Sequence, residues 1–183
     1  MTLKPFPTIE VGMIILREIE QKDINSAFQY FSDVEVVKYW GASPFTDPQH
    51  VAGMLNGMRL SFYKDEGIRW GIALKETDEM IGTIGFHNWS KSANRAEIGY
   101  ELAREHWGRG ILSSVMRPVL SCGFNDFGMN RIAATIRHEN TASIKLIEKF
   151  GFKQEGILRD YQSVNGAYFD LLLFSLLKRE YKN

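Results

Sequence analysis

The sequence predicts an α/β fold in which a mixed, mostly antiparallel twisted sheet carries helices on both faces. Two observations predict it. Segments whose apolar residues alternate, as they do in strands, are interspersed with segments whose apolar residues recur at helical spacing. Their order along the chain is β-α-α-β-β-β-α-β-α-β-β, which implies a mixed sheet covered by helices. A chain of 183 residues has the length of one domain, so we expect residues 1–183 to form a single unit.

Four elements are expected in the first part of the chain. The run VGMIILR, residues 11–17, reads as a strand. Asp23 is positioned to cap a helix over residues 24–31, and Asp47-Pro48 opens a second helix that reaches residue 62. Residues 68–75 and 80–89 form a hairpin around the polar turn at 76–79, while residues 35–39 are ambiguous.

The second part begins with a strand over residues 97–102 and a helix over 111–127, in which Pro118 should cause a kink. A strand at 131–137 and a helix at 141–150, ended by Gly151, come next. Two long strands, 153–163 and 167–177, then meet at Asn165-Gly166, a strong hairpin turn signal.

Composition narrows the range of functions. Lys plus Arg and Asp plus Glu both number 22, which gives a net charge of zero and argues against a nucleic-acid partner. Cys122 is the single cysteine, so no disulfide framework exists and a cytoplasmic location fits. The N-terminal residues show no apolar core of signal-peptide length. The sequence has no run of about 18 apolar residues, so we expect no membrane-spanning helix.

The most informative stretch is EIGYELAREHWGRGIL, residues 97–112, in which a strand passes through a glycine turn into a helix. The first N–H groups of such a helix have no internal partner, so the turn is a candidate phosphate site. A Walker A loop is excluded because Ile111 follows Gly110, and a dinucleotide fingerprint is excluded because Ser113 stands where a third glycine is needed. The alternative is an ordinary turn that binds nothing.

Three motifs in one order give the chain a family resemblance. They are His106-Trp107-Gly108-Arg109-Gly110, Asn140-Thr-Ala-Ser143 and Phe150-Gly151-Phe152. With this order of elements the chain resembles the GNAT family of N-acetyltransferases. Its tail, EGILR at 155–159 followed by Asn165-Gly166 and Asp170, looks like the branch that acetylates the N-terminal amines of ribosomal proteins.

The resemblance implies that acetyl-coenzyme A binds where the fourth and fifth strands, at 97–102 and 131–137, splay apart. The pantetheine arm would pair with the edge of the fourth strand at Leu102, Ala103 and Arg104. The pyrophosphate would lie on amides of the turn and helix start, at Trp107, Gly108, Arg109, Gly110, Ile111 and Leu112. Asn140 and Ser143 would border the thioester.

The implied chemistry is attack of an amine on a thioester, which requires a neutral amine and hence a general base. Glu97, on the fourth strand, is our candidate base, and the alternative is an exposed glutamate or an ion-pair partner. The chain departs from the family in two places. Glu105 replaces the usual Gln or Arg of the turn, and Ile147 stands where many members carry a tyrosine acid, which leaves Ser143 as the nearest hydroxyl.

The acceptor is less defined. Trp40 and Trp89 adjoin predicted loops and are candidates for the substrate cleft. We expect a protein N-terminus as acceptor, with a small amine, such as a polyamine or an amine antibiotic, and a non-catalytic acyl-coenzyme A binding module as alternatives. The histidines show no metal-ligand spacing, so no metal is expected, and Cys122 is expected to be structural. The oligomeric state is open, with a homodimer as one candidate.

Overall fold

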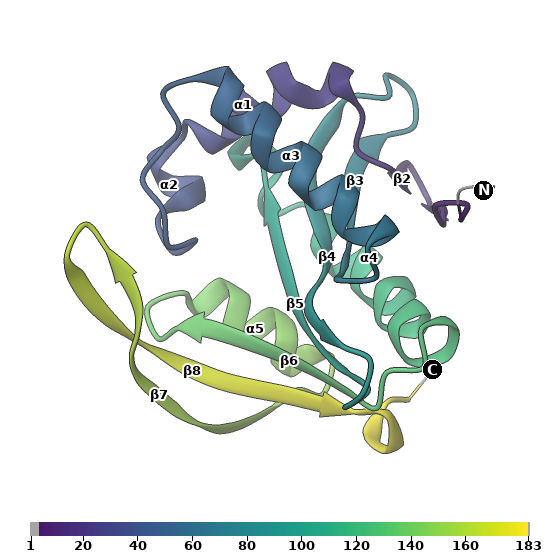
Figure 1. Cartoon of the computed structure of the whole chain (residues 1–183), viewed down its shortest axis with the longest axis vertical. Helices are drawn as coiled ribbons and strands as arrows, with labels where there is room; N and C mark the ends of the chain where they lie inside the picture. The colour runs from purple at the N-terminus through teal and green to yellow at the C-terminus, as the bar shows by residue number, and fades with distance from the viewer. Residues whose placement is uncertain (1–3, 183) are drawn as a thin grey trace.

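The computed structural model describes residues 4–182 and has an eight-stranded sheet at its centre (Figure 1). Within residues 4–182 the strand order in the sheet is β1-β2-β3-β4-β5-β6-β8-β7, and β5 and β6 are the one neighbouring pair that runs parallel. The predicted fold class, a mixed and mostly antiparallel sheet with helices, is confirmed. The strands are β1 (Ile9–Val11), β2 (Ile14–Arg17), β3 (Ile68–Leu74), β4 (Met80–Ser90), β5 (Arg95–Leu102), β6 (Arg131–Arg137), β7 (Lys153–Val164) and β8 (Ala167–Leu177).

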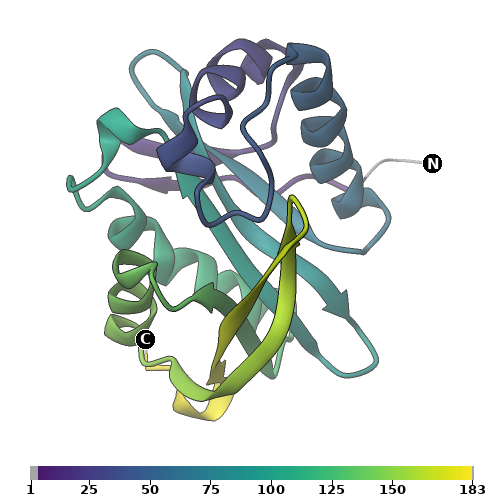
Figure 2. The same cartoon turned by 90° about the vertical axis from the view of Figure 1, so that its left-hand side faces the viewer.

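Helices cover both faces of the sheet (Figure 2). Helices α1 (Ile24–Phe31), α2 (Val34–Val37) and α3 (Pro48–Tyr63) share a cluster of buried side chains with Met80, the first residue of β4, and Ala103, which directly follows β5. Helices α4 (Ile111–Ser121) and α5 (Thr141–Lys149) contribute to a larger cluster with the sheet's other face. Within residues 4–182, none of the helices has the length and apolar character needed to cross a bilayer.

Three local expectations are corrected. The predicted strand at 11–17 is a hairpin, because Gly12 has a positive φ of 54° and turns the chain between β1 and β2. Asp23 does not cap α1, because its carboxylate accepts two hydrogen bonds of 2.8 Å from the buried Arg17 guanidinium. The helix predicted to reach residue 127 passes through Pro118 and changes to a π-helical turn at Cys122–Asp126.

Strands β5 and β6 separate soon after they meet. They pair only from Arg95 opposite Arg131 to Glu97 opposite Ala133, whereas β6 pairs with β8 along its whole length. Beyond Glu97 the two strands diverge, and a wedge opens between them (Figure 1). The splayed fourth and fifth strands expected from the sequence are therefore β5 and β6.

Candidate active site

The glycine turn before α4 has the features of an anion site. Gly108 and Gly110 adopt positive φ angles of 72° and 74°, and a Cβ at either position would meet no atom within 4 Å. Gly110 is the N-cap residue of α4, and no side chain caps the helix. Ser114 donates to the Gly110 carbonyl at 2.9 Å, so the amides that precede Ser114 in the helix have no helical acceptor. These open amides at a positive helix end fit a phosphate group.

The end of β5 presents backbone groups toward the wedge. The Ala103 N–H donates to the Ile81 carbonyl of β4 at 2.7 Å, so the preceding Leu102 carbonyl faces the opposite edge. Trp107 donates its indole N–H to that carbonyl at 2.7 Å. The indole thus ties the glycine turn to the strand edge on which an extended arm could pair.

A hydroxyl pair lies where α5 begins. The Asn140 side chain accepts a hydrogen bond from the Ser143 N–H at 3.2 Å and caps the helix. The Ser143 Oγ lies 2.7 Å from the Tyr100 hydroxyl of β5. Burial raises the pKa of Tyr100 to about 12, against the opposing effect of the Ser143 hydrogen bond, so both hydroxyls stay protonated at neutral pH. We missed Tyr100 in the sequence because its alternation with Ile98 and Leu102 reads only as an apolar strand face.

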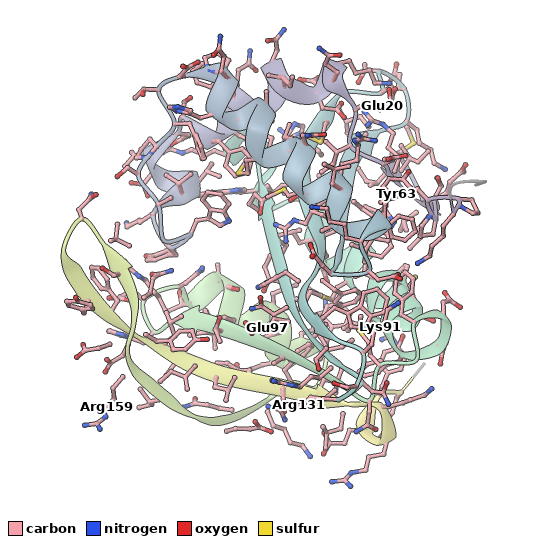
Figure 3. The ribbon with its side chains drawn as sticks, in the orientation of Figure 1. Glu20, Tyr63, Lys91, Glu97, Arg131 and Arg159 are labelled. Carbon is pink, nitrogen blue, oxygen red and sulfur yellow. The ribbon has the colours of Figure 1, made fainter. Side chains whose placement is uncertain are left out.

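Glu97 lies on the wall of a cavity of about 210 Å³ at the closed end of the wedge. Its carboxylate accepts a hydrogen bond from Asn88 Nδ2 at 3.0 Å and lies 3.8 Å from His87 Nε2. The side chain is 21% exposed, so it is partly buried and still open to a ligand. Figure 3 shows it at the centre of the open sheet face. The cavity is lined by Asn88, Arg95, Ala96, Glu97, Arg131, Ala133, Thr135, Leu158, Tyr161 and Leu173.

Comparison with known proteins decides the family. The model of the acetyltransferase (GNAT) domain matches residues 13–153. The chain belongs to the GNAT family.

Individual relatives agree with this assignment. The chain is 42% identical over 174 residues to an uncharacterized N-acetyltransferase, p20, of Bacillus licheniformis, covering 95% of this chain and 98% of that protein. It is 38% identical over 103 residues to a putative ribosomal N-acetyltransferase, YdaF, of Bacillus subtilis, 56% of either chain. A crystal structure of spermidine N-acetyltransferase from Vibrio cholerae, with CoA and spermine, superposes with a TM-score of 0.81 at 22% identity, covering 93% and 99% of the two chains. This chain is an acetyl-coenzyme A dependent N-acetyltransferase.

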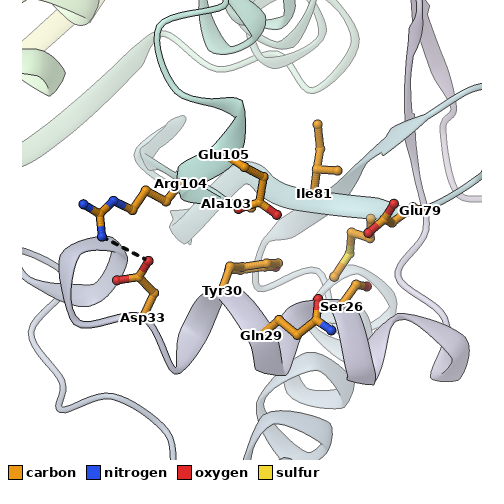
Figure 4. Close-up of a pocket in the computed structure, with 10 residues that line it drawn as sticks. Ser26, Gln29, Tyr30, Asp33, Glu79, Ile81, Ala103, Arg104 and Glu105 are labelled. Carbon is orange, nitrogen blue, oxygen red and sulfur yellow. Dashed lines mark ion pairs between the residues drawn. The ribbon is translucent and has the colours of Figure 1, made fainter.

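Three cationic residues of this GNAT enzyme lie on or near the turn. Arg104 faces Asp33, with 3.9 Å between its Nη1 and the carboxylate, at a small cavity of about 70 Å³ between α1 and the end of β5 (Figure 4). Arg109 is exposed at the turn itself. Lys149, which the sequence reading missed, reaches from α5 to donate to Ser113 Oγ at 2.7 Å, beside the free amides of α4. Of these three, Arg109 and Lys149 are placed to meet an anion on the turn.

A row of polar groups extends from Glu97 along the same face of β3, β4 and β5. A Cβ on Gly99 would lie 2.9 Å from Arg69 Nη1 and 3.3 Å from His87 Cε1, so the glycine leaves space for both side chains. Arg69 donates to Thr83 Oγ1 at 2.6 Å, and both bond the buried Glu101. Desolvation by burial, and then the charge of Arg69, lower the pKa of His87, while Glu97 opposes them. His87 is another residue that the sequence reading missed.

The two tryptophans that were expected to line the substrate cleft, Trp40 and Trp89, are not among the residues that line the Glu97 cavity. Trp40 is partly buried and packs on Phe31 and Phe45, with ring centroids 5.1 and 6.1 Å away. Trp89 packs on Phe127 at 5.0 Å and joins the larger core cluster, so the structure does not bring it to the Glu97 cavity. Trp89 lies within an irregularity of β4, between His87 and Ser90, where the register with β5 shifts and Asn88 has a φ of 50°.

Proposed function

We propose that this GNAT enzyme transfers the acetyl group of acetyl-coenzyme A to the N-terminal amine of a protein or peptide. The composition of the Glu97 cavity carries the proposal. Among its lining residues Glu97 is the one acid, whereas Arg95 and Arg131 bring positive charge, and Arg131 is ion-paired with Glu155 at 2.5 Å. A single carboxylate suits an acceptor with one amine, while a polyamine carries further cations that the exposed Arg95 would repel.

The acidity of the acceptor supports the same choice. An α-amine has a pKa of about 7.7–8.0, whereas an aliphatic amine such as that of lysine has one of about 10.4. A sizeable fraction of an N-terminal amine is therefore neutral near pH 7.5, so only the remaining ammonium has to lose a proton to a base before it can attack. YdaF, named a putative ribosomal N-acetyltransferase, is 38% identical over 103 residues and favours this acceptor, whereas the Vibrio cholerae enzyme named for spermidine is 22% identical over 172 residues.

The residues present fit the coenzyme. In the proposed complex the amides that open α4, with Arg109 and Lys149 beside them, hold the phosphates, and the edge of β5 that faces away from β4 pairs with the pantetheine arm. Bound acetyl-coenzyme A supplies the activated acetyl group. An N–H of the β5 edge is then available to the carbonyl oxygen as negative charge develops on it.

Proton transfer uses the two faces of β5. Residues of a strand point alternately to its two sides, so Glu97 and Tyr100 lie on opposite faces. In our proposal Glu97, directly or through a water, accepts the proton that the amine releases as its lone pair attacks the acetyl carbon. Ser143 donates its hydroxyl proton to the departing sulfur and takes the proton of the Tyr100 hydroxyl in its place, and Tyr100 regains a proton from solvent. His87, close to Glu97, is the second candidate for the base.

The test is the release of free thiol from acetyl-coenzyme A in the presence of single acceptors. We expect peptides with a free N-terminus to give much higher kcat/KM values than spermidine or an aminoglycoside, and N-terminally blocked peptides to give none. Fast turnover of spermidine alone would replace the proposal with a polyamine acceptor. Coenzyme binding without thiol release for any amine would indicate a binding module.

A further inference from the structure

Arg137 is a buried arginine that has no acidic partner in the part of the chain that the structure describes. The residue is 9% exposed, and its guanidinium carbon lies 3.4 Å from the centroid of the Phe169 ring. Its Nε donates to Gln162 Oε1 at 2.7 Å. None of the ion pairs formed within residues 4–182 includes it. The ring and the amide fix the guanidinium plane and leave its two terminal nitrogens for another partner.

The position of Arg137 connects it to the Glu97 cavity. Residues 133, 135 and 137 of β6 alternate with the others and share one face, and Ala133 and Thr135 line that cavity. Arg137 is the last residue of β6, so it lies on the same face at the open end of the wedge. The cavity therefore has a carboxylate near its closed end and a guanidinium beyond its open end.

Two chain segments meet beside Arg137. A Cβ on Gly41, in the segment between α2 and α3, would lie 2.5 Å from Gln162 Nε2, so this segment contacts the side chain that holds the arginine. Ser43 of the same segment exchanges hydrogen bonds of 3.2–3.3 Å with Asn165 at the tip of the β7–β8 hairpin. In Figure 1 this tip is the hairpin end that reaches toward α2. These contacts form a bridge over the sheet face and hold Arg137 in place.

We propose that Arg137 binds a carboxylate of the acceptor and thereby selects peptides with an acidic residue near their N-terminus. A guanidinium presents its terminal nitrogens as a planar fork that matches a carboxylate. An arginine buried on an aromatic ring has lost much of its hydration, so an incoming anion restores interactions that water no longer supplies. The proposal rests on the proposed function, because it takes the acceptor to be a peptide.

The spacing sets where the acid must lie. Ala133 is opposite Glu97, and Arg137 is four residues further along β6, roughly 13 Å at about 3.3 Å per residue. An extended peptide advances about 3.3–3.6 Å per residue, so its third or fourth side chain reaches Arg137 when its amine is near Glu97. A single amino acid is too short to span the two groups.

The experiment compares two amidated tetrapeptides, AADA and AANA, which differ in one charged group. We expect the parent enzyme to prefer AADA by about 10- to 100-fold in kcat/KM, the effect of one charge-assisted hydrogen bond, mainly through KM. Arg137→Gln should remove the preference and leave kcat for AANA and the coenzyme A affinity unchanged. Arg137→Lys should recover part of it. Arg159→Gln, at an exposed arginine of β7 (Figure 3), is the matched control and should keep the preference.

Several results would overturn the proposal. Equal use of the two peptides by the parent enzyme would do so, as would equal losses for both peptides in Arg137→Gln, which indicate a structural role. Weaker coenzyme A binding in that variant would assign Arg137 to the phosphates instead. Calorimetric titration of both peptides measures the preference without turnover. An enzyme that shows the preference in binding but acetylates neither peptide would refute the proposed function and leave the role of Arg137 standing.

Discussion

The two sides of the wedge between β5 and β6 are built in different ways. The β5 side, residues 97–112, is one continuous stretch that offers mostly backbone groups, namely a strand edge and the amides of a helix start. The β6 side gathers side chains from segments that are far apart in sequence. Arg137 and Gln162 are 25 residues apart, and Ser43 and Asn165 are 122 apart. The backbone side suits a ligand common to a family, and the side-chain side suits a ligand that differs between its members.

If the backbone side binds the coenzyme, a charged substitution in the glycine turn should weaken coenzyme A binding strongly, and we expect this to be the largest of the effects predicted here. Gly110→Asp places a carboxylate beside the proposed pyrophosphate site, and we expect the Kd for coenzyme A, measured by calorimetry, to rise by about 10²-fold or more. Gly110→Asn is the matched control, because asparagine tolerates the positive φ of 74° and adds no charge. Unchanged affinity in a folded Gly110→Asp protein would remove the turn from the site.

Substitution of Glu97 tests the other end of the wedge. Glu97→Gln should lower kcat by about 10²-fold, the usual scale for loss of a general base, and leave coenzyme A affinity nearly unchanged. The deficit should shrink as pH rises, because more of the amine is then already neutral. Glu76→Gln, in an exposed turn, is the control for charge removal. If Glu97→Gln keeps full turnover at neutral pH while His87→Asn loses it, His87 is the base.

Removal of either hydroxyl of the pair formed by Ser143 and Tyr100 should lower kcat less than the loss of Glu97 does. Ser143→Ala should lower kcat by about 10-fold, below the usual range for a general acid, because a thiol is a much stronger acid than an alcohol and its thiolate can leave without full protonation. Tyr100→Phe removes only the hydrogen bond of 2.7 Å and keeps the ring, so the rate should fall less. Pre-steady-state measurement of thiol release checks both, and a larger loss in Tyr100→Phe than in Ser143→Ala would make tyrosine the donor.

Cys122 should have the smallest effect, since it belongs to neither side of the wedge. Burial raises the pKa of its thiol to about 12, so the reactive thiolate is scarce at neutral pH. Cys122→Ala should therefore keep kcat/KM within about threefold of the parent, as expected for a packed thiol. Iodoacetamide should modify the folded protein far more slowly than the unfolded chain. Rapid inactivation by this reagent at pH 7 would contradict a structural role.

The sequence predicted best what depends on neighbouring residues. Asn165 and Gly166 adopt the positive φ angles of 51° and 82° that their hairpin requires, and Asp47 caps α3 as expected. The prediction failed where one residue overrides the pattern of its neighbours. Asp23 has the character of a cap but is held by Arg17, and Gly12 turns a run of residues whose pattern reads as one strand.

The same limit applies to the candidate site. The glycine turn and Glu97 lie in one readable stretch, whereas the Tyr100 and Ser143 hydroxyls meet across 43 residues. His87 faces Glu97 because of the register between β4 and β5, and Lys149 reaches Ser113 from another helix. Such pairs follow from tertiary structure, and no local pattern of residue types reveals them.

The divergence of β5 and β6 after three paired residues also has a kinetic consequence. A gap through a sheet has an entrance on each face, so two reactants can approach from opposite sides and neither blocks the other. Acetyl transfer would then proceed through a ternary complex, with no acetylated enzyme in between and no forced order of addition. Coenzyme A as a product would compete with acetyl-coenzyme A but not with the acceptor. A molecule in which coenzyme A is covalently linked to the acceptor would occupy both entrances and compete with both reactants.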